Sequence, residues 1–228
     1  MFSLDYMIYM LPAIILSLIA QFYVKSAYKK YSQVRNYLGI TGAEAAQRLL
    51  PSLGLQNVSI QGTQGTLSDH YDPQNNVLKL SPAVANQPSI ASLAIAAHEL
   101  GHAAQDHTNY LPLKLRGLIV PVVNIGSNLG WIMILVGLML NLAGLAQIGV
   151  IAFSAGAVFS LITLPVELNA SKRARAMLKE NGLVVNAEEE LGVKKVLNAA
   201  ALTYVAALAN SLLQLLYFSG MVRRMNRR

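Results

Sequence analysis

The chain has 228 residues, of which 54% are hydrophobic and only 13% are charged, and its mean hydropathy is +0.43. Ordinary soluble domains carry about a quarter charged residues, so this composition points to an integral membrane protein. The net charge of +7 comes from Lys and Arg residues beside apolar runs, as in the loops of membrane proteins, so we expect no nucleic-acid partner. The absence of cysteine excludes disulfides and thiolate metal ligands.

Four apolar stretches approach or reach the length that spans a bilayer. Residues 6–24 are predicted to form a transmembrane helix, residues 118–166 a helical hairpin with a tight connection at 141–143, and residues 198–220 a fourth apolar helix. The fourth stretch contains several polar side chains, so a spanning path and a re-entrant path both stay open. The first stretch lacks the charge order and cleavage site of a secretory signal peptide, so it is expected to be an anchor.

The distribution of basic residues predicts the orientation of these helices. The positive-inside rule places residues 25–117 and 167–197 on the cytoplasmic side and the 141–143 connection outside. The basic tail, residues 221–228, breaks this pattern if the fourth helix crosses the membrane once more. The sequence therefore predicts a multi-pass protein with two polar segments facing the cytoplasm.

The first polar segment, residues 25–117, has the patterns of a small mixed domain. Residues 41–50 carry the capping signature of a helix that ends before Pro51, and residues 57–61 and 77–81 alternate like strands on either side of a turn-rich stretch. A small sheet of this kind can hold an extended peptide by strand addition, although a plain packing hairpin explains the pattern equally well.

The stretch from His98 to His102 reads His-Glu-Leu-Gly-His, the H-E-x-x-H motif of zinc hydrolases. Pro88-Ser89 and the apolar residues that follow predict a helix here, too short and mixed to span a membrane. Positions four apart share one helix face, so His98 and His102 can bind one Zn²⁺ ion. Glu99 is placed to take a proton from a water that occupies an open coordination position.

A hydrolytic zinc site needs a third protein ligand, and Glu167 is the predicted one. It follows the third apolar stretch, on the same side of the membrane as the two histidines, where a carboxylate is costly unless it is paired or bound to a metal. The alternative is a surface Glu167 that pairs with Lys172 or Arg173.

Other ionisable residues are weaker candidates for the same site. His70 is predicted to lie in a loop, where it either stabilises the oxyanion of the reaction or forms a hydrogen bond with Asp69 or Asp72; a role as third ligand is the weaker option. His107 is rotated off the ligand face and is expected to be structural or exposed. The run Glu188-Glu189-Glu190 is expected to form a solvated face.

Taken together, these segments resemble the YugP-like neutral zinc metallopeptidases, which are bacterial membrane proteins. The likeness covers nearly the whole chain, and its most specific parts are Leu67-Ser-Asp-His-Tyr-Asp-Pro73, Ala97-His-Glu-Leu-Gly-His102 and Leu164-Pro-Val-Glu-Leu-Asn-Ala-Ser171. A looser likeness is to the membrane-integral gluzincins, whose glutamate ligand belongs to an E-x-x-x-D pattern. This chain has Ser171 where that pattern has Asp, so the carboxylate that would support a ligand histidine is missing or comes from elsewhere.

The resemblance implies zinc ligands at His98, His102 and Glu167, with Glu99 as the catalytic base. We expect a mainly helical membrane protein with a small α+β, zincin-like catalytic region and one Zn²⁺ per chain. Its expected function is endopeptidase hydrolysis of membrane or membrane-proximal proteins through a zinc-activated water, at the cytoplasmic face of the bacterial cell membrane. The main alternative is a zinc-stabilised membrane scaffold or assembly factor that does not cleave; an intramembrane protease and a metal transporter fit the apolar segments less well.

Overall fold

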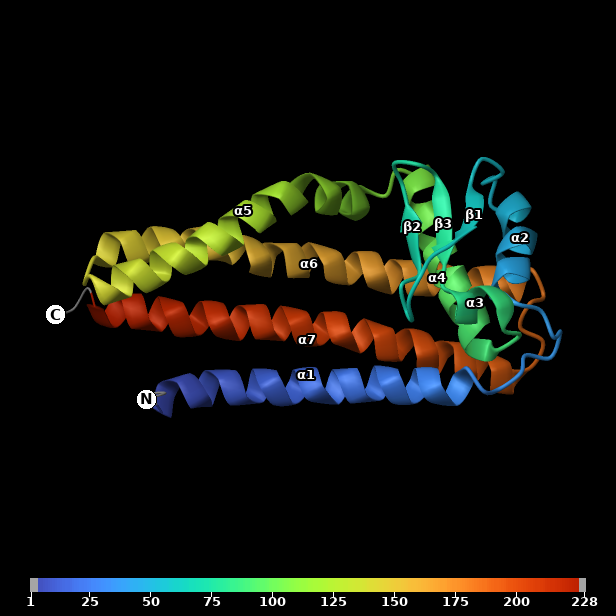
Figure 1. The fold of residues 1–228 in the computed structure, drawn as a ribbon, viewed down its shortest axis with the longest axis horizontal. Helices are drawn as coiled ribbons and strands as arrows, with labels where there is room; N and C mark the ends of the chain where they lie inside the picture. Colours follow the sequence, from blue (N-terminus) through green and yellow to red (C-terminus); the bar gives the residue numbers. More distant parts are fainter. Residues whose placement is uncertain (1–3, 226–228) are drawn as a thin grey trace. The chain divides into compact units, whose positions relative to one another are not determined.

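A computed structural model describes residues 4–225, which form helices joined by short turns and one small sheet (Figure 1). The prediction of a mainly helical chain is confirmed. Arg227 and Arg228 of the predicted basic tail lie outside the described residues. The elements in chain order are α1 (Leu4–Tyr31), α2 (Gly42–Ser52), β1 (Ser59–Gly62), β2 (His70–Asp72), β3 (Val77–Leu80), α3 (Pro82–Asn86), α4 (Ile90–His107), α5 (Leu111–Met139), α6 (Ala143–Glu180) and α7 (Ala187–Met225).

Four helices, α1, α5, α6 and α7, are long and apolar enough to cross a membrane by length and composition. α5 ends at Met139 and α6 begins at Ala143, as the predicted hairpin requires, and Asn141 makes the turn with a left-handed backbone (φ 58°). α6 and α7 extend well beyond their apolar stretches. The predicted polar segment 167–197 therefore consists of the ends of two long helices and the turn between them.

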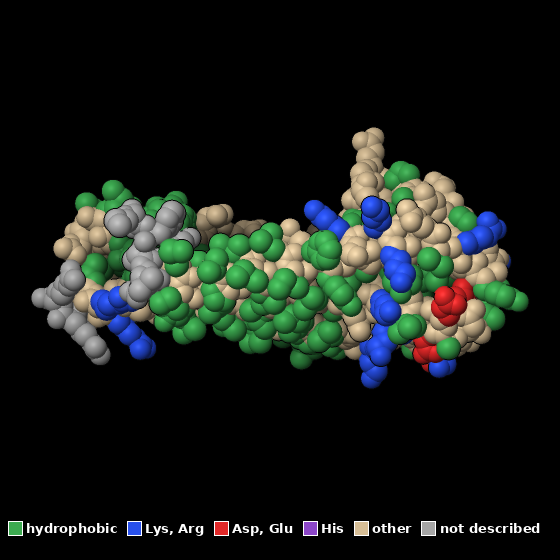
Figure 2. Space-filling view, turned by 90° about the horizontal axis from the view of Figure 1, so that it is seen from below, with side chains coloured by type: hydrophobic (Ala, Val, Ile, Leu, Met, Phe, Trp, Pro, Cys, Tyr) green, Lys and Arg blue, Asp and Glu red, His purple; other side chains and the backbone are tan. Residues whose placement is uncertain are grey.

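The chain divides into two compact units, and the first comprises residues 1–20, 114–165 and 203–228. Its small core consists of Met10, Ile134, Tyr217 and Phe218, and the Phe218 ring lies 5.3 Å from the Trp131 ring and 5.7 Å from the Phe153 ring, both edge-on. Such edge-to-face pairs add to the energy of apolar burial. On the face drawn in Figure 2, hydrophobic side chains form a broad band along the long helices.

Close backbone packing joins α5 to α6 in this unit. A Cβ atom added at Gly130 would lie 2.6 Å from the Phe153 nitrogen, and one added at Gly149 would lie 2.7 Å from the Ile134 nitrogen. Small residues allow two helices to approach this closely. In membranes, where the hydrophobic effect does not drive helices together, the resulting van der Waals contact stabilises their association.

The second unit comprises residues 21–113 and 166–202 and contains the three-stranded sheet. The strand order is β1-β3-β2: β1 runs parallel to the central β3, and β2 pairs with β3 antiparallel, with Tyr71 opposite Leu78. The strands predicted at 57–61 and 77–81 are confirmed with shifted ends. The prediction of a loop at His70 is wrong, because residues 70–72 form the edge strand β2.

The turn between β2 and β3 explains why so short a strand forms. One carboxylate oxygen of Asp72 accepts hydrogen bonds from the backbone nitrogens of Gln74 and Asn75, and the other accepts from the Asn75 side chain. Asn76 then takes a left-handed backbone (φ 52°), which asparagine tolerates better than most residues. The turn therefore fixes the pairing register of the strands.

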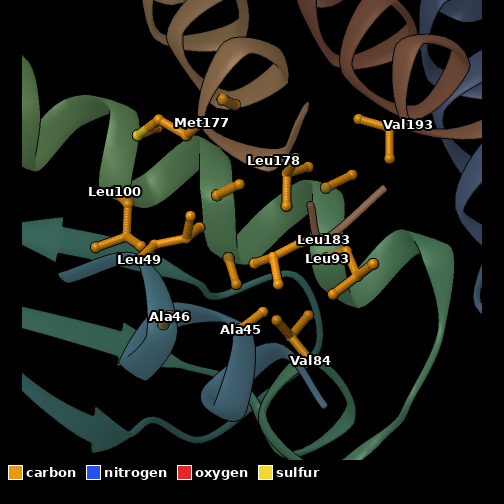
Figure 3. Close-up of a cluster of buried hydrophobic side chains, with 14 of the residues drawn as sticks. Ala45, Ala46, Leu49, Val84, Leu93, Leu100, Met177, Leu178, Leu183 and Val193 are labelled. Carbon is orange, nitrogen blue, oxygen red and sulfur yellow. The ribbon is translucent and has the colours of Figure 1, made fainter. Parts of the chain in front are cut away.

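Helix α4 lies at the centre of the second unit and packs against α2, α3 and the sheet. Its apolar face is buried with side chains from the neighbouring helices, as Figure 3 shows. Fully burying a leucine-sized side chain contributes about 1.5–3 kcal/mol, so this cluster is a main source of the unit's stability. The labelled members are Ala45, Ala46, Leu49, Val84, Leu93, Leu100, Met177, Leu178, Leu183 and Val193.

Two local predictions need correction. α2 has the predicted capping box, in which Thr41 and Glu44 bond each other's backbone nitrogens, but the helix runs through Pro51 to Ser52 rather than ending before it. Glu189 is not solvated: it is 5% exposed and accepts hydrogen bonds from the backbone nitrogens of Tyr37 and Val185. A charge run in the sequence does not reveal that one of its members accepts hydrogen bonds from two backbone amides.

Candidate active site

The two motif histidines lie one helical turn apart on α4. Ser89 caps this helix by accepting a hydrogen bond from the Ser92 nitrogen, and the alanine-rich sequence after it has high helix propensity. The rings of His98 and His102 are 4.9 Å apart between centroids and almost perpendicular, at 85°. Both can therefore point a nitrogen at one position beside the helix.

Helix α6 brings Glu167 to these histidines. α4 and α6 come into contact at Gly101, where an added Cβ atom would lie 2.6 Å from the carbonyl oxygen of Ala170. The glycine inside the H-E-x-x-H motif is therefore required by packing rather than by backbone conformation. Glu167 is 2% exposed, so its carboxylate lies inside the unit and not on the surface that the alternative prediction required.

The geometry of the three side chains matches that of a metal centre. Oε2 of Glu167 lies 3.3 Å from Nε2 of His98 and 3.6 Å from Nε2 of His102, and one ligand atom from each residue falls within 4.8 Å of the others. Tetrahedral zinc with bonds of about 2.0–2.1 Å separates neighbouring ligand atoms by about 3.3 Å. Two imidazoles and a carboxylate are also the donor set of several catalytic zinc sites, so these residues fit the ion.

The pKa of His102 depends on the two carboxylates beside it. Burial lowers the pKa of His102, but the hydrogen bond to Glu167 and the negative charges of Glu99 and Glu167 outweigh it, and the net pKa is raised. Because only a neutral imidazole can bind a metal, protonation of His102 would oppose metal binding by this group.

Glu99 is partly buried beside the ligand group and is held by the sheet. Its Oε2 accepts a hydrogen bond of 3.2 Å from the backbone nitrogen of Tyr71 in the edge strand β2. Burial raises the pKa of the Glu99 carboxyl; the two histidines oppose this rise, and Glu167 and Asp69 reinforce it. A carboxylate whose pKa is raised in this way is a stronger base, as proton transfer near neutral pH requires.

Tyr71 joins the edge strand β2 to helix α4 by hydrogen bonds. Its hydroxyl donates to the Asp106 carboxylate on α4 and also lies 3.1 Å from the Asn76 side chain in the turn. Burial, followed by the negative charge of Asp106, raises the pKa of Tyr71 to about 12. The main chain of Tyr71 therefore joins β2 to Glu99, and its side chain joins β2 to Asp106, two turns further along α4.

The remaining candidates lie outside the ligand group. His70 is exposed on β2, and its Nδ1 lies 2.9 Å from the carbonyl oxygen of Ser68, a hydrogen-bond partner other than the predicted Asp69 or Asp72. Asp69 instead accepts hydrogen bonds from the backbone and hydroxyl of Ser81. His107 is exposed at the end of α4.

The outer nitrogens of both ligand histidines also have partners. Nδ1 of His102 lies 3.0 Å from Oε1 of Gln105, and Nδ1 of His98 lies 3.2 Å from the hydroxyl of Ser171. The residue that departs from the E-x-x-x-D pattern thus still contacts a ligand histidine. Sequence reasoning missed Gln105, although its position three residues after His102 on a helix was a usable signal. No local signal identified Tyr71.

Comparison with known proteins agrees with this geometry. The family model described as "Putative neutral zinc metallopeptidase" matches residues 6–223. The chain is 48% identical over 208 residues to the Bacillus subtilis protein "Putative membrane protease YugP", covering 91% of this chain and 92% of that protein. No solved structure matches the chain. On the extent of the family match, this protein belongs to the neutral zinc metallopeptidase family.

Proposed function

We propose that the protein is a membrane-anchored zinc endopeptidase in which His98, His102 and Glu167 hold the metal and Glu99 is the catalytic base. The observation that carries this proposal is the convergence of three ligand atoms beside a carboxylate of raised pKa. A structural zinc site is usually closed by four protein ligands and has no use for a base. This site offers three ligands and a base, which supports catalysis over the scaffold alternative.

A zinc ion held by His98, His102 and Glu167 would supply a Lewis acid for the scissile carbonyl and for a water molecule. Glu99 accepts a proton from the attacking water as the new carbon–oxygen bond forms. It then gives this proton to the amine nitrogen as the carbon–nitrogen bond breaks, so that the carboxylate is regenerated. The bond from the Tyr71 backbone holds Glu99 in a fixed orientation between these two transfers.

The edge strand offers a place for the substrate. β2 is paired with β3 on one side only, and the Tyr71 nitrogen on its other side points at Glu99. An extended peptide that lay along this edge would have its backbone beside the base, while the Tyr71 amide stays bonded to Glu99. His70, exposed on the same strand, is the candidate for stabilising the oxyanion. This arrangement favours unfolded or extended segments of proteins as substrates.

The four apolar helices and the distribution of basic residues support a location in the cell membrane, with the active site on the cytoplasmic side. The substrates we propose are therefore membrane or membrane-proximal proteins.

The proposal is tested with the detergent-purified full chain, by measuring zinc content and cleavage of an unfolded protein in parallel. Glu99→Gln should retain one zinc per chain and lose about 100- to 10,000-fold in cleavage rate, because only the base is removed. Glu188→Gln, the same change at an exposed site, is the matched control and should behave as wild type.

Cleavage that survives in Glu99→Gln would exclude Glu99 as the base and with it this mechanism. A wild type that binds zinc through the three ligands and cleaves none of a broad panel of unfolded and membrane proteins would favour the scaffold.

A further inference from the structure

Gln105 is a fully buried polar side chain, 0% exposed, that contacts both helices of the metal site. Its Oε1 lies 3.0 Å from Nδ1 of His102 on α4. Its Nε2 donates to the backbone carbonyl of Val166 at 2.8 Å and to Oδ1 of Asn169 at 3.0 Å, both on α6. A buried amide is stable only when its hydrogen-bonding groups are satisfied, and Gln105 meets this condition at the site itself.

The contact with Val166 determines which way the Gln105 amide points. A backbone carbonyl can only accept a hydrogen bond, so the amide nitrogen of Gln105 must face α6. Its oxygen then faces His102 and, having no hydrogen, must accept. Nδ1 of His102 therefore carries the hydrogen, and the lone pair of a neutral His102 lies on Nε2, the atom 3.6 Å from the Glu167 carboxylate.

A second acceptor fixes the same orientation from the other end. Oδ1 of Asn169 also accepts a 2.9 Å hydrogen bond from Nε of Arg173, a group that always donates. The Arg173 guanidinium lies over the ring of Tyr110, at 6.0 Å from its centroid. The amide of Asn169 is thereby oriented, and it presents an acceptor to Gln105.

The other ligand histidine has a different kind of partner. Nδ1 of His98 lies 3.2 Å from the hydroxyl of Ser171, which can rotate to donate or to accept. Ser171 therefore satisfies either tautomer of His98 and selects neither. The surrounding protein therefore selects one tautomer of His102 but leaves both tautomers of His98 possible.

We propose that Gln105 is a positioning residue that fixes the tautomer and ring orientation of His102 for metal binding, through its bonds to Val166 and Asn169. This inference rests on the metal centre of the proposed function. It assigns the support of a ligand histidine to a neutral amide, in a chain that lacks a carboxylate at the E-x-x-x-D position.

The first test is zinc affinity, measured by chelator competition on the detergent-purified full chain. Gln105→Met keeps the size of the side chain, removes all three hydrogen bonds and should weaken zinc binding about 10- to 100-fold. Ser171→Ala is the matched control on the other histidine and should weaken it by no more than about 3-fold. Asn169→Asp preserves the acceptor for Gln105 and Arg173 and should stay near wild type.

The second test uses wild-type protein and so does not depend on the folding of a variant. With Co²⁺ in place of zinc, the ring N–H protons of the ligand histidines give shifted NMR signals that exchange with water. We expect two signals, one of which exchanges at least about 10-fold more slowly because Gln105 buries and accepts it. Ser171→Ala should alter only the fast one.

The inference is overturned if Gln105→Met binds zinc as tightly as Ser171→Ala, or if the two signals exchange equally fast. In both cases wild type still binds zinc and Glu167→Ala still loses it, so the metal centre stands. If instead wild type binds no zinc, the proposed function fails together with this inference.

Discussion

The two compact units of this protein differ in which side chains they bury and which they expose. The second unit buries polar groups: Gln105, Glu167 and Glu189 are all nearly inaccessible, and each has hydrogen-bonding or ionic partners. The first unit exposes apolar groups, and large hydrophobic side chains of α1 and α5 such as Leu18 (59% exposed) and Leu118 (73% exposed) lie on its surface.

The free-energy cost of burying a polar side chain or exposing an apolar one therefore depends on the unit in which it lies. In water, a buried polar group must be satisfied inside the protein or it costs about 1–3 kcal/mol. In lipid, an exposed apolar side chain costs nothing, and packing depends on close contact between small residues. Substitutions that perturb one unit should therefore leave the other largely intact.

The largest effect is expected for Glu167→Ala in the second unit. Loss of one of three ligands should weaken zinc binding about 100- to 1,000-fold, because Glu167 is the one anionic side chain in the group of His98, His102 and Glu167. Chelator competition measures the affinity, and circular dichroism should show little loss of helix. Glu180→Ala, at the exposed end of the same helix, is the control; a similar loss of affinity there would contradict the ligand assignment.

A matched pair of glycines tests the comparison directly. Gly101→Ala and Gly130→Ala each place a Cβ atom 2.6 Å from backbone of a neighbouring helix, in the second and the first unit respectively. Each should destabilise the protein by about 1–3 kcal/mol, since backbone must move. Only Gly101→Ala should also reduce zinc affinity, because it displaces α6 at the site. Equal zinc affinity in both variants would show that the α4–α6 contact does not position Glu167.

Lowering the pH should weaken zinc binding in the second unit through protonation of His102. Its raised pKa means that the proton is bound more tightly in the folded, metal-free protein than in the unfolded chain. Zinc affinity should therefore fall about tenfold per pH unit once the pH drops below this pKa, as protons displace the metal.

In zinc-free protein, by contrast, lowering the pH should stabilise the fold. The stabilisation that the proton gives is fully present below the pKa of about 6.5 of an unfolded histidine and is lost as the pH rises through the raised folded value. Thermal unfolding of zinc-loaded and zinc-free protein across this pH range checks both directions. A zinc affinity that does not change with pH would exclude His102 as a ligand.

The smallest effect is expected for Tyr71→Phe, which removes the hydroxyl contacts to Asp106 and Asn76 but keeps the backbone bond to Glu99. The second unit should lose about 0.5–1.5 kcal/mol, with Tyr37→Phe, at a 74% exposed tyrosine, as the control. Because the pKa of Tyr71 is raised from 10 to about 12, its stabilising contribution is complete below pH 10 and disappears as the pH approaches 12. A tyrosine absorbance titration with no group near 12 in wild type would refute this environment.

The sequence was sufficient where function depends on short-range patterns. The helical setting of His98 and His102, the apolar helices and the turn at Asn141 follow from periodicity and composition, which local structure obeys. Glu167 could be nominated because a carboxylate at the end of an apolar stretch needs a reason to be there.

What could not be predicted depends on contacts between distant segments. β2 is three residues long and has little strand signal of its own; it forms because the Asp72 turn and Tyr71 fasten it. Glu189 looks like its two acidic neighbours, and only the fold shows that it closes a loop 152 residues earlier in the chain. The partners of buried polar groups are a property of tertiary structure.

The separation of the ligands along the chain has a consequence for the biosynthesis of the protein. His98 and its ligand partner Glu167 are 69 residues apart. At about 5–20 residues per second, the ribosome makes the base and both histidines roughly 3–14 s before the third ligand exists. For this time the nascent chain carries Glu99 and only two of the three proposed ligands. On the proposed function, the metal site cannot be completed, and proteolysis cannot begin, until residue 167 of α6 has been made.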